Sequence, residues 1–131
     1  MRYINAVAIS QYAFPLAVAE VARQGEIAAG DSATGKILPA AVSTTQIPIG
    51  FFMDEAIGDD TKTVTVRLFE ETWAYRCAND VTTPVLNAFQ TVYLQDGGTV
   101  SALATGTSVA GIALEVSSEG VLVVFRKLGV A

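Results

Sequence analysis

Apolar and polar residues along this chain follow the short period of β-strands. In residues 61–68, lysine, valine and leucine side chains share one face, while three threonines and Arg67 share the other. A period of two that includes β-branched residues predicts a strand with one buried face. Residues 47–53 form an apolar run of strand length bounded by polar residues, which predicts a buried strand.

The same kind of pattern continues toward the C-terminus. Residues 69–79 place Trp73, Tyr75 and Cys77 at alternate positions, which predicts a strand with an aromatic face. The sequence Gln95-Asp96-Gly97-Gly98 predicts a hairpin turn, because both glycines tolerate positive φ. Further strands are predicted at residues 89–94, 99–103, 109–116 and 121–128. The chain is therefore expected to be all-β.

Residues 1–24 are expected to form an N-terminal arm. Pro15 interrupts their pattern, and the residues after it are compatible with a short helix or an extended segment. The aromatic residues Tyr3, Tyr12 and Phe14 either add to a partner's surface or pack on the arm's own domain. Polar residues leave no apolar core of the length that a secretory signal or membrane helix needs, so neither is expected.

Two stretches of the chain repeat each other by residue class. Aligning Gly50 with Gly111 places Asp54 opposite Glu115, Val66 opposite Phe125, Arg67 opposite Arg126 and, upstream, Ile37 opposite Val100. Short strands at regular spacing, separated by turn signals, are typical of barrels and sandwiches. We therefore predict a small β-barrel or sandwich built from two similar β units. The units are expected at residues 25–79 and 80–131, in one compact domain.

Composition argues against catalysis. The net charge is −5 and the eight lysines and arginines are scattered, so the clustered cations that nucleic-acid binding needs are missing. The chain has no histidine, and its single cysteine, Cys77, cannot build a thiolate zinc site. Asp54, Glu55, Asp59 and Asp60 lie in one turn and lack the ligand spacing of a calcium loop. No catalytic residue, metal or cofactor is expected.

One part of the repeat carries a resemblance. The pattern Gly-Lys-Ile at residues 35–37, Pro-Ile-Gly-Phe-Phe-Met-Asp at 48–54 and Val-Thr-Val-Arg-Leu at 64–68 resembles the capsid cement, or head decoration, proteins of tailed bacteriophages. The second copy, residues 109–126, is similar to the same pattern with Ala110 in place of the proline. This chain carries two copies where many such proteins carry one.

The resemblance implies a non-enzymatic protein on the outer surface of the capsid in the virion. It would bind the major capsid protein of the assembled shell and stabilise the mature shell. It also implies a homo-oligomer, with a trimer favoured and a dimer possible. Contacts to the capsid or to other subunits are then expected from Tyr3, Tyr12, Phe14, Trp73 and Tyr75.

A small carbohydrate- or ligand-binding β module is the alternative. Trp73 and Tyr75 lie on one face of their predicted strand, as stacking on a sugar requires, and Asn79 and Asp80 follow them. An enzyme is not expected, because the serines and threonines have no histidine to activate them and the carboxylates of the acidic turn are not held apart across a cleft.

Overall fold

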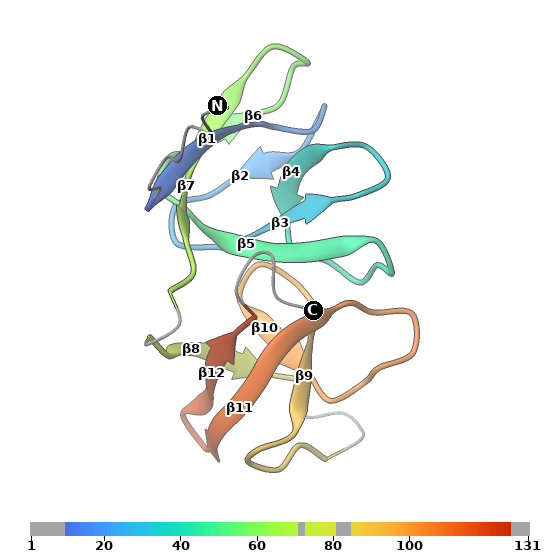
Figure 1. The fold of residues 1–131 in the computed structure, drawn as a ribbon, viewed down its shortest axis with the longest axis vertical. Helices are drawn as coiled ribbons and strands as arrows, with labels where there is room; N and C mark the ends of the chain where they lie inside the picture. The colour runs from blue at the N-terminus through green and yellow to red at the C-terminus, as the bar shows by residue number, and fades with distance from the viewer. Residues whose placement is uncertain (1–9, 71–72, 81–84, 127–131) are drawn as a thin grey trace, which may run out of the picture.

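The computed structural model describes residues 10–70, 73–80 and 85–126, which form two β units that lie one above the other in Figure 1. The strands are β1 (Gln11–Pro15), β2 (Val21–Ala22), β3 (Ile27–Asp31), β4 (Lys36–Pro39), β5 (Gln46–Phe52), β6 (Ala56–Ile57), β7 (Thr63–Leu68), β8 (Tyr75–Asn79), β9 (Thr91–Leu94), β10 (Thr99–Ser101), β11 (Val109–Ser117) and β12 (Gly120–Phe125). Within these ranges no helix is long and apolar enough to cross a bilayer. The expected all-β fold is confirmed.

The first unit, residues 10–70, is a five-stranded sheet in the order β1-β7-β5-β3-β4. Neighbouring strands are antiparallel, and a parallel bridge from Leu16 to Ile37 brings the two outer strands together. The amide of Ala17 donates to the carbonyl oxygen of Ile37 at 2.9 Å beside this bridge. A short sheet of β2 and β6 is added to this unit.

The second unit, residues 73–126, is a closed barrel in the order β10-β8-β12-β11-β9. The parallel pair that closes it joins β10 to β8, with Val100 opposite Asn79. The amide of Asp80 donates to the carbonyl oxygen of Val100 at 2.9 Å, as Ala17 does to Ile37 in the first unit. The expected barrel is confirmed, and β1, β3, β4, β5 and β7 correspond in order to β8, β9, β10, β11 and β12.

The two units also share their register. Gly50 pairs with Leu68 in the first unit, and Gly111 pairs with Phe125 in the second. Each long strand has an irregularity just before its glycine, where it meets β3 or β9. A Cβ on Gly50 or on Gly111 would collide with a backbone carbonyl of the neighbouring strand, so both close approaches require glycine.

One part of the repeat alignment is corrected by this register. Because Gly50 pairs with Leu68 and Gly111 with Phe125, the residue equivalent to Phe125 is Leu68, two positions beyond the predicted Val66. The reason is the connection before the closing strand. In the first unit it contains β6, whereas β11 and β12 join directly through a hairpin. The predicted match of Ile37 with Val100 holds. Ile37 pairs with Gly30 and Val100 pairs with Leu94, and each partner lies two residues after the β3 or β9 residue that pairs with Gly50 or Gly111.

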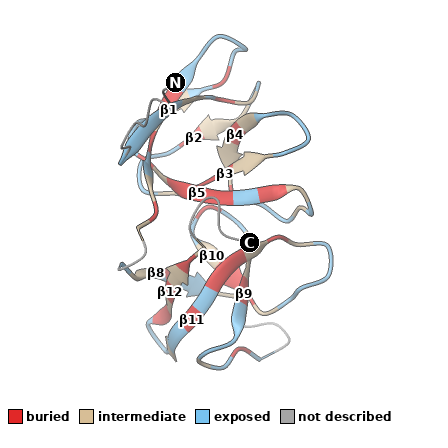
Figure 2. Ribbon diagram, viewed as in Figure 1, coloured by how far each residue is buried: buried red, intermediate tan, exposed pale blue. Residues whose placement is uncertain are grey.

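Two cores lie inside the molecule. The core of the first unit gathers around Leu16, Ile37 and Phe52. The core of the second unit also takes in residues of the first, among them Ile27 and Phe69. Figure 2 shows buried residues along β5, which runs at the boundary between the units. The units therefore pack as one domain.

The described part of the N-terminal segment packs on its own domain, one of the two alternatives that the sequence left open, and it does so as a strand of the sheet. All five residues of β1 pair with residues 63–67 of β7, and Leu16 and Ala22 are buried. Residues 1–9, including Tyr3, lie outside the described residues. The local pattern missed β1 because its partner strand lies some 50 residues later in the chain.

The boundary between the units is also corrected. β8 pairs with β12 and β10, so it belongs to the second unit and not to the first, where the sequence pattern placed it. The turn-forming residues after Asn79 suggested a break there. Strand pairing, which joins residues far apart in sequence, sets the break between β7 and β8 instead.

Candidate interaction surfaces

Tyr12 and Phe14 lie on the same side of β1. Their ring centroids are 4.9 Å apart, and Phe14 packs against the core of the first unit. Tyr12 is 53% exposed. The partly buried ring of Phe14 therefore supports the exposed ring of Tyr12.

Trp73 and Tyr75 form a second aromatic pair, at the start of the second unit. Trp73 is 50% exposed, and the guanidinium carbon of Arg67 lies 5.5 Å from its ring centroid. Such a cation–π contact fixes the ring from one side. Tyr75 lies 6.3 Å away between centroids and supports it from another. Ring contacts between described residues do not join this pair to Tyr12 and Phe14.

Tyr75 serves mainly to join the units. Its ring lies 4.6 Å from that of Phe51 and 5.9 Å from that of Phe125, centroid to centroid. Phe69 and Phe125 stack at 4.1 Å in the same cluster. Burial raises the pKa of the Tyr75 hydroxyl. The aromatic face predicted for this strand is therefore largely a packing surface, and Trp73 is its exposed part.

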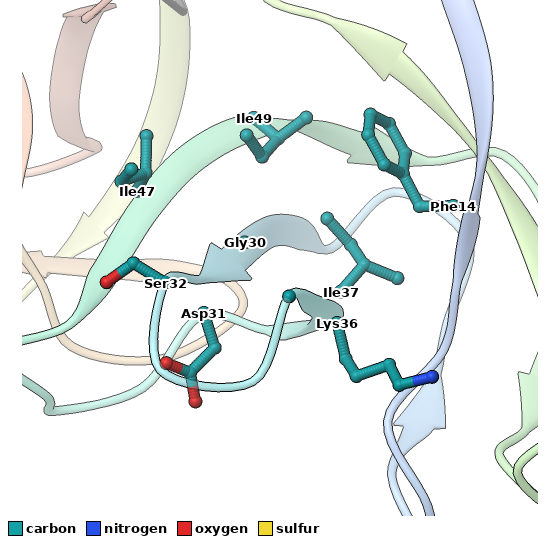
Figure 3. Close-up of a pocket in the computed structure, with 9 residues that line it drawn as sticks. Phe14, Gly30, Asp31, Ser32, Lys36, Ile37, Ile47 and Ile49 are labelled. Atoms are coloured by element: carbon teal, nitrogen blue, oxygen red, sulfur yellow. The ribbon is translucent and has the colours of Figure 1, made fainter.

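A cavity of about 190 Å³ opens at one end of the first unit. Figure 3 shows Phe14, Ile37 and Ile49 around it, with Asp31 and Lys36 near its edge. We call this end, together with the exposed Tyr12, the mouth of the first unit.

The cavity exists because Gly30 leaves space at a position that a large side chain fills in the second unit. Gly30 pairs with Ile37 as Leu94 pairs with Val100, so Leu94 is its equivalent. Leu94 is fully buried in the core of the second unit.

The corresponding end of the second unit is closed by the first unit. Phe51 of β5 packs over Tyr75 and Phe125. The amide of Ile27 donates to the carbonyl oxygen of Gly97 at 2.7 Å. Apolar packing and directed hydrogen bonds thus hold the units in one orientation.

A buried serine adds two further bonds at this boundary. The Ser108 hydroxyl accepts a hydrogen bond from the backbone amide of Gln46 at 3.1 Å and donates one to the backbone carbonyl oxygen of Ser43 at 2.6 Å. The residue belongs to the second unit and both partners belong to the first. Losing the hydroxyl would leave an amide and a carbonyl unpaired at the boundary.

Phe89 is an exposed aromatic residue that sequence reasoning missed. It is 78% exposed and has a φ of 71°, in the left-handed region that non-glycine residues seldom occupy. Its neighbour Val85 is also 78% exposed. Both line a shallow depression with Thr91, Tyr93 and Ala102 on the outer side of β9. Its signal in the sequence was weak, because the predicted strand 89–94 included it as an ordinary first residue.

Two groups that could be reactive, the Asp59 carboxylate and the Cys77 thiol, have structural roles. The Asp59 carboxylate accepts bonds from the Thr61 hydroxyl at 2.7 Å and from the Thr61 and Lys62 amides, and the hydroxyl bond lowers the pKa of Asp59. Burial raises the pKa of the Cys77 thiol to about 12. In the described part of the chain, no three acidic or cysteine side chains form a group that could hold a metal ion.

Comparison with protein-family models, with curated proteins and with solved structures finds no match to this chain.

Proposed function

We propose that this protein is a non-enzymatic capsid cement protein, which binds the major capsid protein on the outer surface of a tailed-phage head and stabilises the mature shell. The proposal takes its direction from the sequence resemblance. The structural observation that carries it is the state of Trp73, half exposed yet held between Arg67 and Tyr75. A rigid exposed aromatic ring is a typical binding residue, because it buries a large area at low entropic cost.

The arrangement of the rest of the chain supports a binding role. The two units share a hydrophobic core and so form a stiff platform. The Asp59 carboxylate holds a turn together by hydrogen bonding, and the Cys77 thiol is buried in the core. A stiff platform presents its contact residues without reorganisation, which reduces the entropic cost of binding.

The mechanism follows from linkage. A protein that binds the mature lattice and not its immature or dissociated forms stabilises the mature lattice in proportion to occupancy. Each contact can be weak, because a shell offers many copies of the same site and an oligomer that engages several of them gains effective concentration. The large number of equivalent sites thus compensates for the small size of the protein.

Binding to phage heads tests the proposal. The genes beside this chain's own would first be searched for a major capsid protein. Expanded and unexpanded heads assembled from that protein would then be mixed with this chain and sedimented. We expect binding to expanded heads and a higher temperature of shell disruption. Trp73→Ala should weaken binding about 30-fold, the effect of a central interface residue.

Ile57→Ala is the matched control, since Ile57 is an exposed apolar residue at 65% on the added strand β6. It should bind as the wild type does. Equal binding to unexpanded heads, or full binding by Trp73→Ala, would contradict the proposal. Saturable binding to a glycan panel that Trp73→Ala abolishes would instead favour the carbohydrate-binding alternative.

A further inference from the structure

The contact between the two units is asymmetric. The first unit contributes a side surface of β3 and β5, while the second contributes the end of its barrel. We call the first surface the capping face. It comprises Ile27 and Ala29 of β3 and Phe51 of β5, with Ala40 after β4 and Phe69 after β7, and these residues pack with the core of the second unit. Because the units share their fold, each of these two surfaces has an equivalent elsewhere in the same chain, and the structure shows whether it is covered.

The equivalent of the capped barrel end is the mouth of the first unit. Tyr75, on which Phe51 packs, corresponds to Tyr12, since Tyr75 pairs with Val123 as Tyr12 pairs with Val66. Tyr12 is 53% exposed, and among the described residues its ring contact is with Phe14 of the same strand. Phe125 corresponds to Leu68, which is partly exposed. Over residues 10–70, 73–80 and 85–126, the mouth is therefore the exposed counterpart of a surface that is capped in the second unit.

The equivalent of the capping face lies on the outer side of β9 and β11. Phe51 corresponds to Ile112, because each lies one residue after the glycine that pairs with the closing strand. Phe51 pairs with Arg67, and Ile112 pairs with Val124. Ile112 is 52% exposed. Ala29 corresponds to Tyr93, which lines the depression beside Phe89. In Figure 2, β11 shows exposed segments where β5 is mostly buried.

We propose that the β9–β11 face of one copy caps the mouth of the first unit in a second copy. The occupant of each surface is thus this chain itself. Ile112 would lie against Tyr12 as Phe51 lies against Tyr75 within the chain. Such a contact joins two different surfaces, so it produces a closed ring or an open chain of copies.

Phe89 supports this assignment independently. Its equivalent in the first unit is Gly25, which has a φ of 87°. The amide of Phe89 donates to Ala113, and that of Gly25 donates to the corresponding residue, Phe52. The second unit therefore keeps a phenylalanine where the backbone favours glycine, at a cost of about 1–3 kcal/mol for a left-handed non-glycine residue. A side chain held outward at that cost fits a contact surface.

The proposal needs only copies of this chain, so it can be tested without capsids and its failure is separate from that of the capsid role. Sedimentation velocity over a range of concentrations would measure self-association. We expect Ile112→Glu and Tyr12→Glu each to weaken it about 30-fold or more. Phe89→Gly should weaken it without adding charge. Ile57→Glu, a matched change on β6, should associate as the wild type does.

Mixing the two charge variants identifies the contact as head-to-tail. Tyr12→Glu keeps an intact β9–β11 face and Ile112→Glu keeps an intact mouth. At a concentration where each variant alone is monomeric, the mixture should therefore form a one-to-one dimer. Circular dichroism and thermal unfolding would establish that both are folded. The proposal is overturned if the wild type stays monomeric up to about 1 mM, the weak end of specific affinities. It is also overturned if the mixture stays monomeric while the wild type associates.

Discussion

Gly25 and Phe89 occupy equivalent positions in the two units and share one backbone conformation. Their φ angles are 87° and 71°, and their amides donate to Phe52 at 2.9 Å and to Ala113 at 2.7 Å. Glycine adopts this conformation freely, whereas phenylalanine adopts it only under strain. The same hydrogen bond thus forms in both units, but only the second unit stores strain at that point.

Replacing Phe89 with glycine should therefore stabilise the folded chain. The relief of strain exceeds the extra entropy of glycine in the unfolded state, so we expect a gain of about 1 kcal/mol in the free energy of unfolding. Gly25→Ala should lower the free energy of unfolding by about 1 kcal/mol, because alanine at this position introduces the same backbone strain into the first unit. Urea denaturation of the monomeric protein measures both. A destabilised Phe89→Gly would mean that the phenylalanine ring contributes packing that outweighs the strain.

Gly50→Ala and Gly111→Ala should both be strongly destabilising. A Cβ at either position would collide with backbone, of Arg67 or of Val124, and backbone cannot move aside as a side chain can. We expect losses of about 2–4 kcal/mol in the free energy of unfolding. Gly98→Ala is the control, because a Cβ there meets no atom within 4 Å. If Gly50→Ala were as mild as that control, the strand spacing described above would be incorrect.

Ser108→Ala should weaken the boundary between the units. The substitution removes the acceptor of the Gln46 amide and the donor to the Ser43 carbonyl. An unpaired polar group at a buried position costs about 1–3 kcal/mol. Chemical denaturation followed separately by far-UV circular dichroism and by Trp73 fluorescence would measure the loss and show whether the units still unfold together. Ser118→Ala, at an exposed position in the β11–β12 hairpin, should change stability by less than about 0.5 kcal/mol.

Cys77 should make stability fall at alkaline pH. Its folded-state pKa of about 12 lies above the ordinary thiol value of 9.0, because burial disfavours the thiolate. Folding therefore favours the protonated form, and this contribution is complete below pH 9 and is lost as the pH rises toward 12. The difference in unfolding free energy between wild type and Cys77→Ala should shrink above pH 9. A difference that stays constant up to pH 11 would contradict this burial effect.

The sequence by itself determined several of the strands and the repeated unit. The strict alternation of residues 61–68 and the apolar run of residues 47–53 contain the information locally, because side chains point to alternate faces of a strand. The match of Gly50 with Gly111 was also visible, since both positions require glycine for the same close approach to a neighbouring strand.

Only the tertiary structure decided which strands belong together and which surfaces are covered. β1 and β8 join their units through partners far along the chain, so local patterns assigned the first to an arm and the second to the wrong unit. Tyr12 and Tyr75 look alike in the sequence, yet one is exposed and the other is packed under Phe51. That difference arises from how the units pack on each other, which depends on long-range contacts that no local pattern contains.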